Sequence, residues 1–95
     1  MNIRQNEFHP KIKLFKDAGF DDTWEIKWYE GDGLKVSKKL SNGKAIHIWE
    51  IRGGYQCAAL VDGSYTDHGY KAPEQTALNI LQVHKYALDL EKKHS

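Results

Sequence analysis

The side chains of this chain best suited to thiolate or zinc chemistry are one cysteine and five histidines. Cys57 falls within the run Tyr55 to Val61 and has no cationic neighbour in sequence, so we expect an inert core residue rather than a nucleophile. The histidines follow no recognised ligand spacing, and no second cysteine could complete a zinc site. They are His9, His47, His68, His84 and His94. The sequence therefore predicts no catalytic site, no metal site and no cofactor.

His84 differs from the other histidines because it falls in an apolar stripe between Leu81 and Leu88. A buried neutral imidazole held by one hydrogen bond is the simpler interpretation. A pair with His47 across a covered sheet face is the alternative. The carboxylates of residues 17–32 lack the spacing of a calcium loop, and the glycine pairs fall in expected hairpin turns rather than before a helix.

Length and composition describe one small domain, residues 1–95. The hydrophobic fraction is 40%, the charged fraction is 28% and the formal net charge is +1, which is typical of an ordinary globular protein. A single cysteine cannot form an internal disulfide, so we expect a cytoplasmic protein. No apolar run approaches the roughly 20 residues of a membrane span, and the polar start MNIRQNEFHPK lacks the apolar core of a signal peptide. We therefore expect no membrane association.

The positive charge gathers in residues 34–54, where the only acidic residue is Glu50. The basic residues of this segment are Lys35, Lys38, Lys39, Lys44 and Arg52. Such a run is typical of a solvated strand edge that discourages aggregation.

The order of apolar and polar residues predicts an antiparallel meander of four to five strands. Residues 23–29, TWEIKWY, alternate with the two-residue period of a half-buried strand. Asn-Gly favours a two-residue hairpin loop because both positions tolerate positive φ angles. The remaining strands are expected at 34–40, 45–52, 55–61 and 64–70, with turns at 30–33, 42–43, 53–54 and 62–63.

A C-terminal amphipathic helix is expected to begin at Pro73 and to pack on one face of the sheet. Pro10 can open a short N-terminal helix through Lys16 that ends at Gly19. The predicted fold class is therefore α+β. The apolar stripe of the C-terminal helix is expected to contain Ala77, Ile80, Leu81, His84, Ala87 and Leu88.

Two-residue loops at 42–43 and 53–54 would fix which side chains share a face of the sheet, and would place Lys35 opposite Glu50. The face expected to carry the C-terminal helix collects Leu34, Val36, Lys38, Leu40, Ala45, His47, Trp49, Ile51, Gln56, Ala58 and Leu60. The opposite face collects Lys35, Ser37, Lys39, Ile46, Ile48, Glu50, Arg52, Tyr55, Cys57, Ala59 and Val61.

This second face carries an apolar strip that must be covered, since monomers seldom expose large apolar patches. One explanation is that the N-terminal segment, with Phe8, Ile12, Leu14, Phe15 and Phe20, folds across it. The other is that a protein partner or a second copy of the chain covers it. The second explanation predicts a small noncatalytic binding, accessory or inhibitor protein of bacterial or phage type. Its expected anchors are Ile46, Ile48 and Tyr55, with Arg52 and Lys35 on the rim.

Nucleic-acid binding by the basic hairpin of residues 34–54 is the alternative function. Lys35, Lys39 and Arg52 would supply phosphate contacts, and Tyr55 would supply stacking. Three strands followed by a helix are similar to the arm-type DNA-binding domains of phage integrases, which implies a sheet that reads a DNA groove. A helix, a set of strands and a second helix after GYKAPEQTA resemble the order of the double-stranded-RNA-binding domain, whose phosphate-gripping lysine cluster is reduced here to Lys71.

Overall fold

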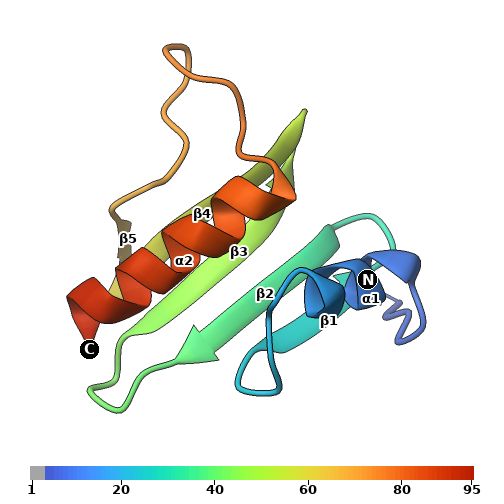
Figure 1. Cartoon of the computed structure of the whole chain (residues 1–95), viewed down its shortest axis with the longest axis horizontal. Coiled ribbons are helices and arrows are strands. Elements are labelled where there is room, and N and C mark those ends of the chain that lie inside the picture. Colours follow the sequence, from blue (N-terminus) through green and yellow to red (C-terminus); the bar gives the residue numbers. More distant parts are fainter. Residues whose placement is uncertain (1–3) are drawn as a thin grey trace.

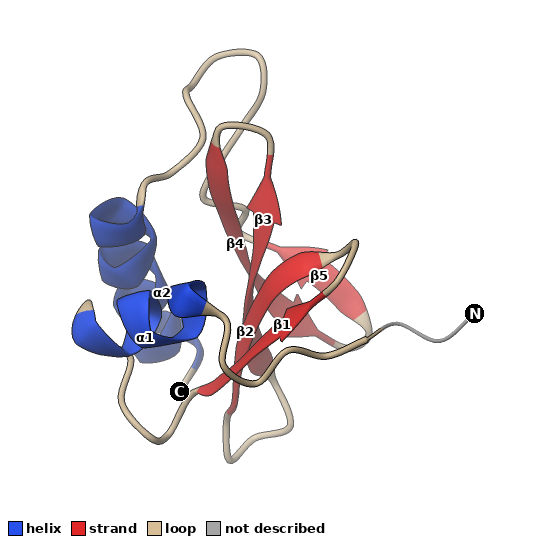
Figure 2. Ribbon diagram, turned by 90° about the vertical axis from the view of Figure 1, so that its right-hand side faces the viewer, coloured by secondary structure: helices blue, strands red, loops and turns tan. Residues whose placement is uncertain are grey.

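The computed structural model describes residues 4–95 as an α+β fold, in which a five-stranded antiparallel sheet carries two helices. The strands follow the chain in the order β1-β2-β3-β4-β5 (Figure 1). The elements are α1 (Pro10–Asp17), β1 (Glu25–Tyr29), β2 (Gly33–Lys39), β3 (Ala45–Ile51), β4 (Gly54–Val61), β5 (Ser64–Thr66) and α2 (Ile80–His94). The predicted fold class and meander are confirmed. Both helices lie on the same face of the sheet, which leaves the other face uncovered by helices (Figure 2).

The short N-terminal helix begins and ends close to its predicted bounds. Pro10 opens α1, and the His9 side chain caps it by accepting a hydrogen bond from the Lys11 amide. Gly19, with φ of 119°, closes it. The Phe20 amide donates to the Phe15 carbonyl at 3.2 Å, and the two rings stack with centroids 5.2 Å apart. This Schellman arrangement turns the chain back toward the sheet.

The loop between β2 and β3 contains three residues, 41–43, rather than the two that were predicted. The Leu40 amide donates to the Lys44 carbonyl at 2.8 Å, and Gly43 takes a φ of 85°, as in a type I turn followed by a glycine bulge. Lys35 consequently pairs with Trp49 instead of Glu50. A one-residue slip reverses every side chain of a strand, so the predicted faces of β2 were exchanged relative to β3.

The loop between β3 and β4 also differs from its prediction, but with less consequence. Arg52 and Gly53 form the turn, and Trp49 pairs with Gln56 instead of Ala58. A shift of two residues leaves each side chain on its expected face. The helix face of the sheet therefore combines Leu34 and Val36 of β2, Ile46 and Ile48 of β3, and Cys57 and Ala59 of β4.

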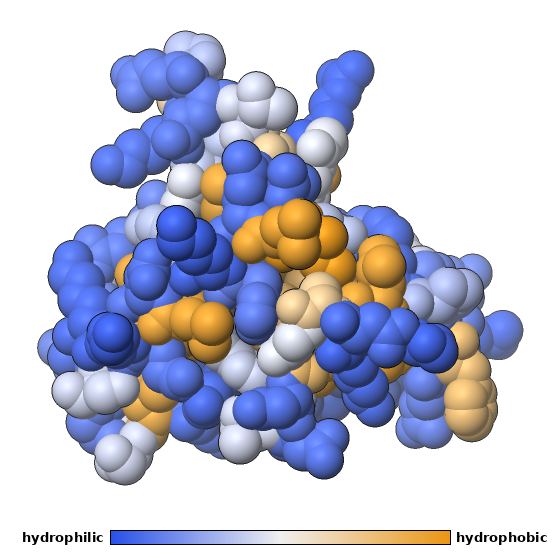
Figure 3. All heavy atoms as spheres, in the orientation of Figure 1, coloured by the Kyte–Doolittle hydropathy of each residue, from blue (hydrophilic) through white to orange (hydrophobic). Residues whose placement is uncertain are grey.

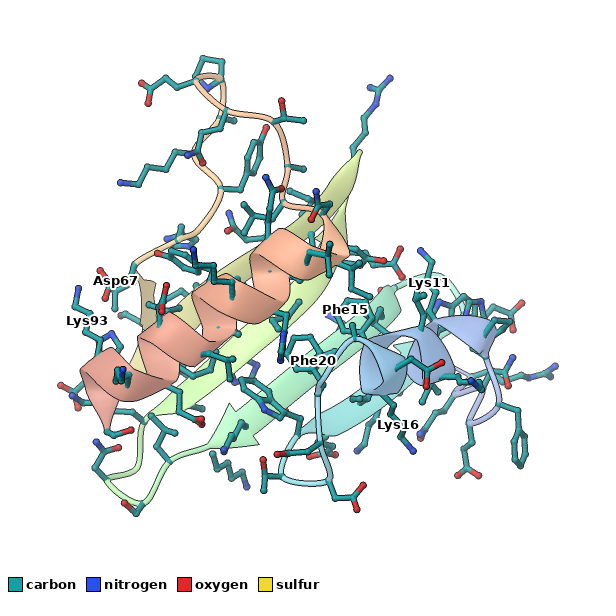
Figure 4. All side chains as sticks on the ribbon, viewed as in Figure 1. Lys11, Phe15, Lys16, Phe20, Asp67 and Lys93 are labelled. Atoms are coloured by element: carbon teal, nitrogen blue, oxygen red, sulfur yellow. The ribbon has the colours of Figure 1, made fainter. Side chains whose placement is uncertain are left out.

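The placement of the C-terminal helix on the face of Trp49 and Leu60 is wrong, because both helices cover the face of Ile46 and Ile48. Phe15 and Phe20 project from α1 and the segment after it into the space beside α2 (Figure 4). Of the N-terminal side chains predicted to cover this face, Ile12, Phe15 and Phe20 are buried, whereas Phe8 and Leu14 are exposed. The N-terminal segment therefore covers this face together with α2.

Helix α2 begins at Ile80, seven residues after the predicted start at Pro73. Asn79 and Gln82 form a reciprocal capping box at its first turn. Its buried side chains are Val83, Ala87 and Leu90. Leu81, 71% exposed, and Leu88, 44% exposed, lie on the surface instead, where apolar patches interrupt a mostly polar helix layer (Figure 3).

The chain between β5 and α2 is a long loop, residues 67–79, because β5 ends at Thr66 rather than at the predicted Tyr70. Asp67 has a φ of 54° and accepts hydrogen bonds from His94 at 2.8 Å and Lys93 at 3.1 Å. These bonds hold the pKa of Asp67 below its usual value. Figure 4 shows Asp67 beside Lys93 at the C-terminal end of α2, so the loop is tied to the helix at the start of its path.

Glu50 connects α1 to the sheet. Its carboxylate lies 2.6 Å from the Lys11 ammonium and accepts a hydrogen bond from the Leu34 amide at 2.7 Å. Burial works against the charged form, but Lys11 and the Leu34 amide together lower the pKa of Glu50. The folded protein therefore binds the Glu50 proton less tightly than the unfolded chain does.

Glu50→Gln is expected to lower the free energy of unfolding at pH 7 by about 1 kcal/mol, since the pair is part-exposed and solvent screens it. A carboxyl group whose pKa is lower in the folded state than in the unfolded chain stabilises the fold at any pH above the unfolded pKa. This stabilisation is lost as the pH falls through the pKa of the folded state. The difference from wild type should thus begin to shrink in urea unfolding curves as the pH drops below about 4.5, and should vanish once the pH lies below the lowered pKa of the folded state. The exposed Glu7→Gln should show no difference at either pH, and an equal deficit of Glu50→Gln at both pH values would contradict the ion-pair explanation.

Candidate functional site

The face of the sheet opposite the helices contains a hollow of about 410 Å³. The sheet is strongly twisted (Figure 2), so that β1 and β5, at opposite edges, both contribute side chains to its walls. The residues that line it are Glu25, Lys27, Tyr29, Lys35, Ser37, His47, Trp49 and Tyr65, together with Val36 and Ile48, whose side chains pack on the helix side of the sheet. We call this surface the open face.

Aromatic side chains form one side of the hollow. The Tyr65 ring lies 5.2 Å from the Trp49 ring and 5.6 Å from the His47 ring, between centroids. Tyr65 is 47% exposed, and Trp49 and His47 are half-buried. Tyr29 adds a half-buried aromatic ring from β1. An aromatic ring that packs against the protein on one side and is exposed to solvent on the other is suited to stack on a flat ligand.

Lysines of β1 and β2 supply the charge of the open face. Lys27 and Lys35 stand directly opposite each other in the sheet, an arrangement of like charges that costs stability unless something offsets it. Glu25 forms an ion pair with Lys27, which raises the pKa of Lys27 and lowers that of Glu25. Within residues 4–95, Lys35 and Lys39 take part in no ion pair.

A second, smaller hollow of about 240 Å³ extends the first toward the β2–β3 hairpin. It shares Ser37 and His47 with the first and adds Lys39 and Lys44. Burial, reinforced by the Lys35 ammonium, lowers the pKa of His47, so this imidazole is neutral at pH 7. The two hollows adjoin at Ser37 and His47, along β2 and β3.

The predicted binding residues are divided between the two sides of the sheet. Ile46 and Ile48 are 0% and 1% exposed beneath the helices, so their placement on an open surface is wrong. Tyr55 also belongs to the helix side, where its ring meets Phe15 at 5.0 Å. Arg52 is exposed in the β3–β4 turn, and Lys35 and Lys39 are exposed on the open face.

Several side chains of the open face were not predicted as site residues, namely Lys27, Tyr29, Trp49 and Tyr65. Alternation in TWEIKWY did place Glu25 and Lys27 opposite the apolar side chains of β1, and that signal could have identified Lys27. Trp49 was assigned to the helix-covered face. Tyr65 reaches the site only because β5 folds back along β4.

Cys57 and His84 lie on the helix side of the sheet, away from this surface. Burial raises the pKa of the Cys57 thiol to about 12, which leaves it protonated at neutral pH. His84 packs against Phe20 in the helix layer, whereas His47 is on the open face, so the suggested pair of His47 and His84 does not form. Among residues 4–95 there is no group of three or more His, Cys, Asp or Glu side chains placed to share a metal ion.

Helices in the described part of the chain are too short or too polar to cross a membrane. Comparison of the chain with protein-family models, curated proteins and solved structures found no match in any of the three.

Proposed function

We propose that this chain is a noncatalytic nucleic-acid-binding protein that holds its ligand on the open face of the sheet. The observation that carries the proposal is the concentration of lysines and aromatic rings on one concave surface. Lys27, Lys35 and Lys39 share that surface with Trp49 and Tyr65. Ammonium groups neutralise phosphates, and aromatic rings stack on nucleobases. The two kinds of side chain together therefore suit a nucleic acid.

The choice between a protein and a nucleic acid depends on which side chains are accessible. The expectation of a protein partner rested on an apolar strip around Ile46 and Ile48, and those side chains are buried in the core. The accessible face instead presents lysines, with Glu25 as the single carboxylate among the residues that line the hollows. A protein-binding core is depleted of charged residues, so this composition favours the anionic ligand.

A second support comes from the like-charged pair of Lys27 and Lys35. Two ammonium groups in register repel each other in the free protein. The Glu25 carboxylate relieves the repulsion for Lys27 alone. A phosphate near Lys35 would relieve it further, and binding would release the counterions of that phosphate into solution.

Lys35→Ala combined with Lys39→Ala is expected to weaken binding to a fluorescein-labelled oligonucleotide roughly 10- to 100-fold at about 50 mM salt. Each lost phosphate contact also reduces the steepness with which log K falls against log salt by about 0.7–0.9. The negative slope of log K against log salt should become shallower by roughly 1.4–1.8. Fluorescence anisotropy titrations over a range of salt concentrations measure both quantities, with single-stranded and duplex probes of the same sequence.

The matched control removes two lysines from the helix side, with Lys16→Ala combined with Lys92→Ala. Both are exposed on the helices, so the net charge changes equally while the open face is unaltered. The control should bind within about twofold of wild type, because screening weakens charges more than about 8–10 Å away. An equal loss in both double variants, or no binding of wild type to either probe at low salt, would contradict the proposal.

A further inference from the structure

We infer that the ligand of the open face is a single strand, whose unpaired bases stack on Tyr65 and Trp49 while Lys35 and Lys39 hold its phosphates. This inference rests on the proposed function. It goes further by choosing single-stranded over duplex nucleic acid. It also assigns the base contacts and the phosphate contacts to different β-strands of the protein.

The shape of the site argues against a duplex ligand. The major groove of duplex DNA is about 12 Å wide, and it is read by an element that protrudes from the protein, such as a helix or a two-stranded ribbon. Here the lysines and rings line a depression in a molecule whose principal extents are 33 × 32 × 30 Å. The helix layer lies on the other face of the sheet (Figure 2). A depression cannot enter a groove, but it can receive a base that has turned out of its stack.

The exposed rings also favour unpaired bases. In a duplex the flat surfaces of the bases are already covered by their neighbours, so an aromatic ring on the protein adds little. An unpaired base gains roughly 5- to 150-fold in affinity from one stacking contact. Tyr65 is 47% exposed although its ring contacts both His47 and Trp49, so it is held in place while much of its surface remains accessible.

The register of the sheet places the two kinds of contact side by side. Lys35, Ser37 and Lys39 alternate along the open face of β2, so Lys35 and Lys39 are separated by roughly 13 Å at the backbone. Trp49 pairs directly with Lys35, and Tyr65 pairs with Leu60 beyond β3. A single-stranded nucleic acid whose phosphates follow β2 would therefore direct its bases across β3 toward β5.

The test compares a thymidine 12-mer with a duplex of the same length, by anisotropy competition at about 150 mM salt. Wild type is expected to bind the single strand at least tenfold more tightly. Tyr65→Leu is expected to lose roughly 5- to 150-fold for the single strand and to keep its duplex affinity. Tyr65→Phe, which retains the ring, should bind both probes as wild type does, and circular dichroism checks that each variant is folded.

The possible failures of this experiment are distinct. If the duplex binds as tightly as the single strand, or if Tyr65→Leu binds the single strand like wild type, the stacking inference is overturned while nucleic-acid binding stands. If neither probe binds wild type, nucleic-acid binding itself fails, and the open face becomes a candidate surface for a protein partner.

Discussion

Ile48→Glu is expected to prevent the chain from folding, whereas Trp49→Glu, one residue further along β3, is expected to leave it folded. Ile48 is 1% exposed beneath the two helices. Removing its side chain alone would cost roughly 2–5 kcal/mol, and a carboxylate without a partner at that position adds several more. This sum is comparable with the roughly 5–15 kcal/mol that stabilises a typical domain.

Trp49 is the matched control because it lies on the open face and is only half-buried. Its replacement by glutamate should lower the free energy of unfolding by roughly 1–3 kcal/mol, through lost contact with Tyr65. Far-ultraviolet circular dichroism and urea unfolding curves measure both variants. If Ile48→Glu unfolded with a wild-type midpoint while Trp49→Glu was unfolded in buffer, the helices would have to lie on the other face.

This pair of variants tests which side of β3 lies beneath the helices, a feature that the sequence pattern left ambiguous. Alternation of apolar and polar residues located all five strands, and the glycines identified the four hairpin turns. The number of residues in the loop at Asn42-Gly43 was not determined, because Asn-Gly occurs in two-residue loops and also in three-residue loops that end in a glycine bulge. One extra loop residue was enough to exchange the two faces of β2.

The apolar content of both strand faces made this ambiguity hard to resolve. On β3, Ile46 and Ile48 alternate with Trp49 and Ile51, so hydrophobicity alone does not tell the core side from the solvent side. The charges of β2 did not resolve it, because the predicted faces already placed Lys35 and Lys39 opposite the helix and Val36 beneath it. The loop length decides whether Ile48 or Trp49 pairs with Val36 on the covered side.

The start of the C-terminal helix shows a second limit of local patterns. Pro73 and Glu74 suit a helix N-terminus, but Asn79 and Gln82 suit one better, since they can cap each other. A start at Ile80 is compatible with a buried stripe of Val83, Ala87 and Leu90. The predicted stripe instead contained Leu81 and Leu88, which are exposed. The choice between the two stripes depends on the sheet against which the helix packs.

The candidate site was predictable only in its charged half. The basic block of residues 34–54 pointed to Lys35 and Lys39, which lie on the open face. The stacking half depends on Tyr65 reaching Trp49 across β4, and that contact exists only after β5 has paired with β4. No local pattern in the sequence brings those two residues together, so this part of the site required the three-dimensional arrangement.

Gly19→Ala is expected to cost roughly 2–4 kcal/mol, for two separate reasons. Gly19 has a φ of 119°, which disfavours any residue with a Cβ atom. A Cβ atom at this position would also lie 2.6 Å from Cε1 of His84. Phe20 limits how far that imidazole can move away, since the centroids of the two rings are 4.7 Å apart. The turn that closes α1 and the surface of α2 therefore fit together only around a glycine.

Gly31→Ala separates the two causes, because Gly31 has a φ of 93° but nothing within 4 Å of the added Cβ atom. It should cost only the backbone strain, about 1–2 kcal/mol. Adding His84→Ala to Gly19→Ala should recover the steric part, so the double-mutant cycle should give a coupling energy of roughly 1–2 kcal/mol. Urea unfolding of the four proteins of the cycle measures this energy. If the coupling were zero, His84 would not be packed over Gly19, and the imidazole in the apolar stripe of α2 would lack the structural role that this contact gives it.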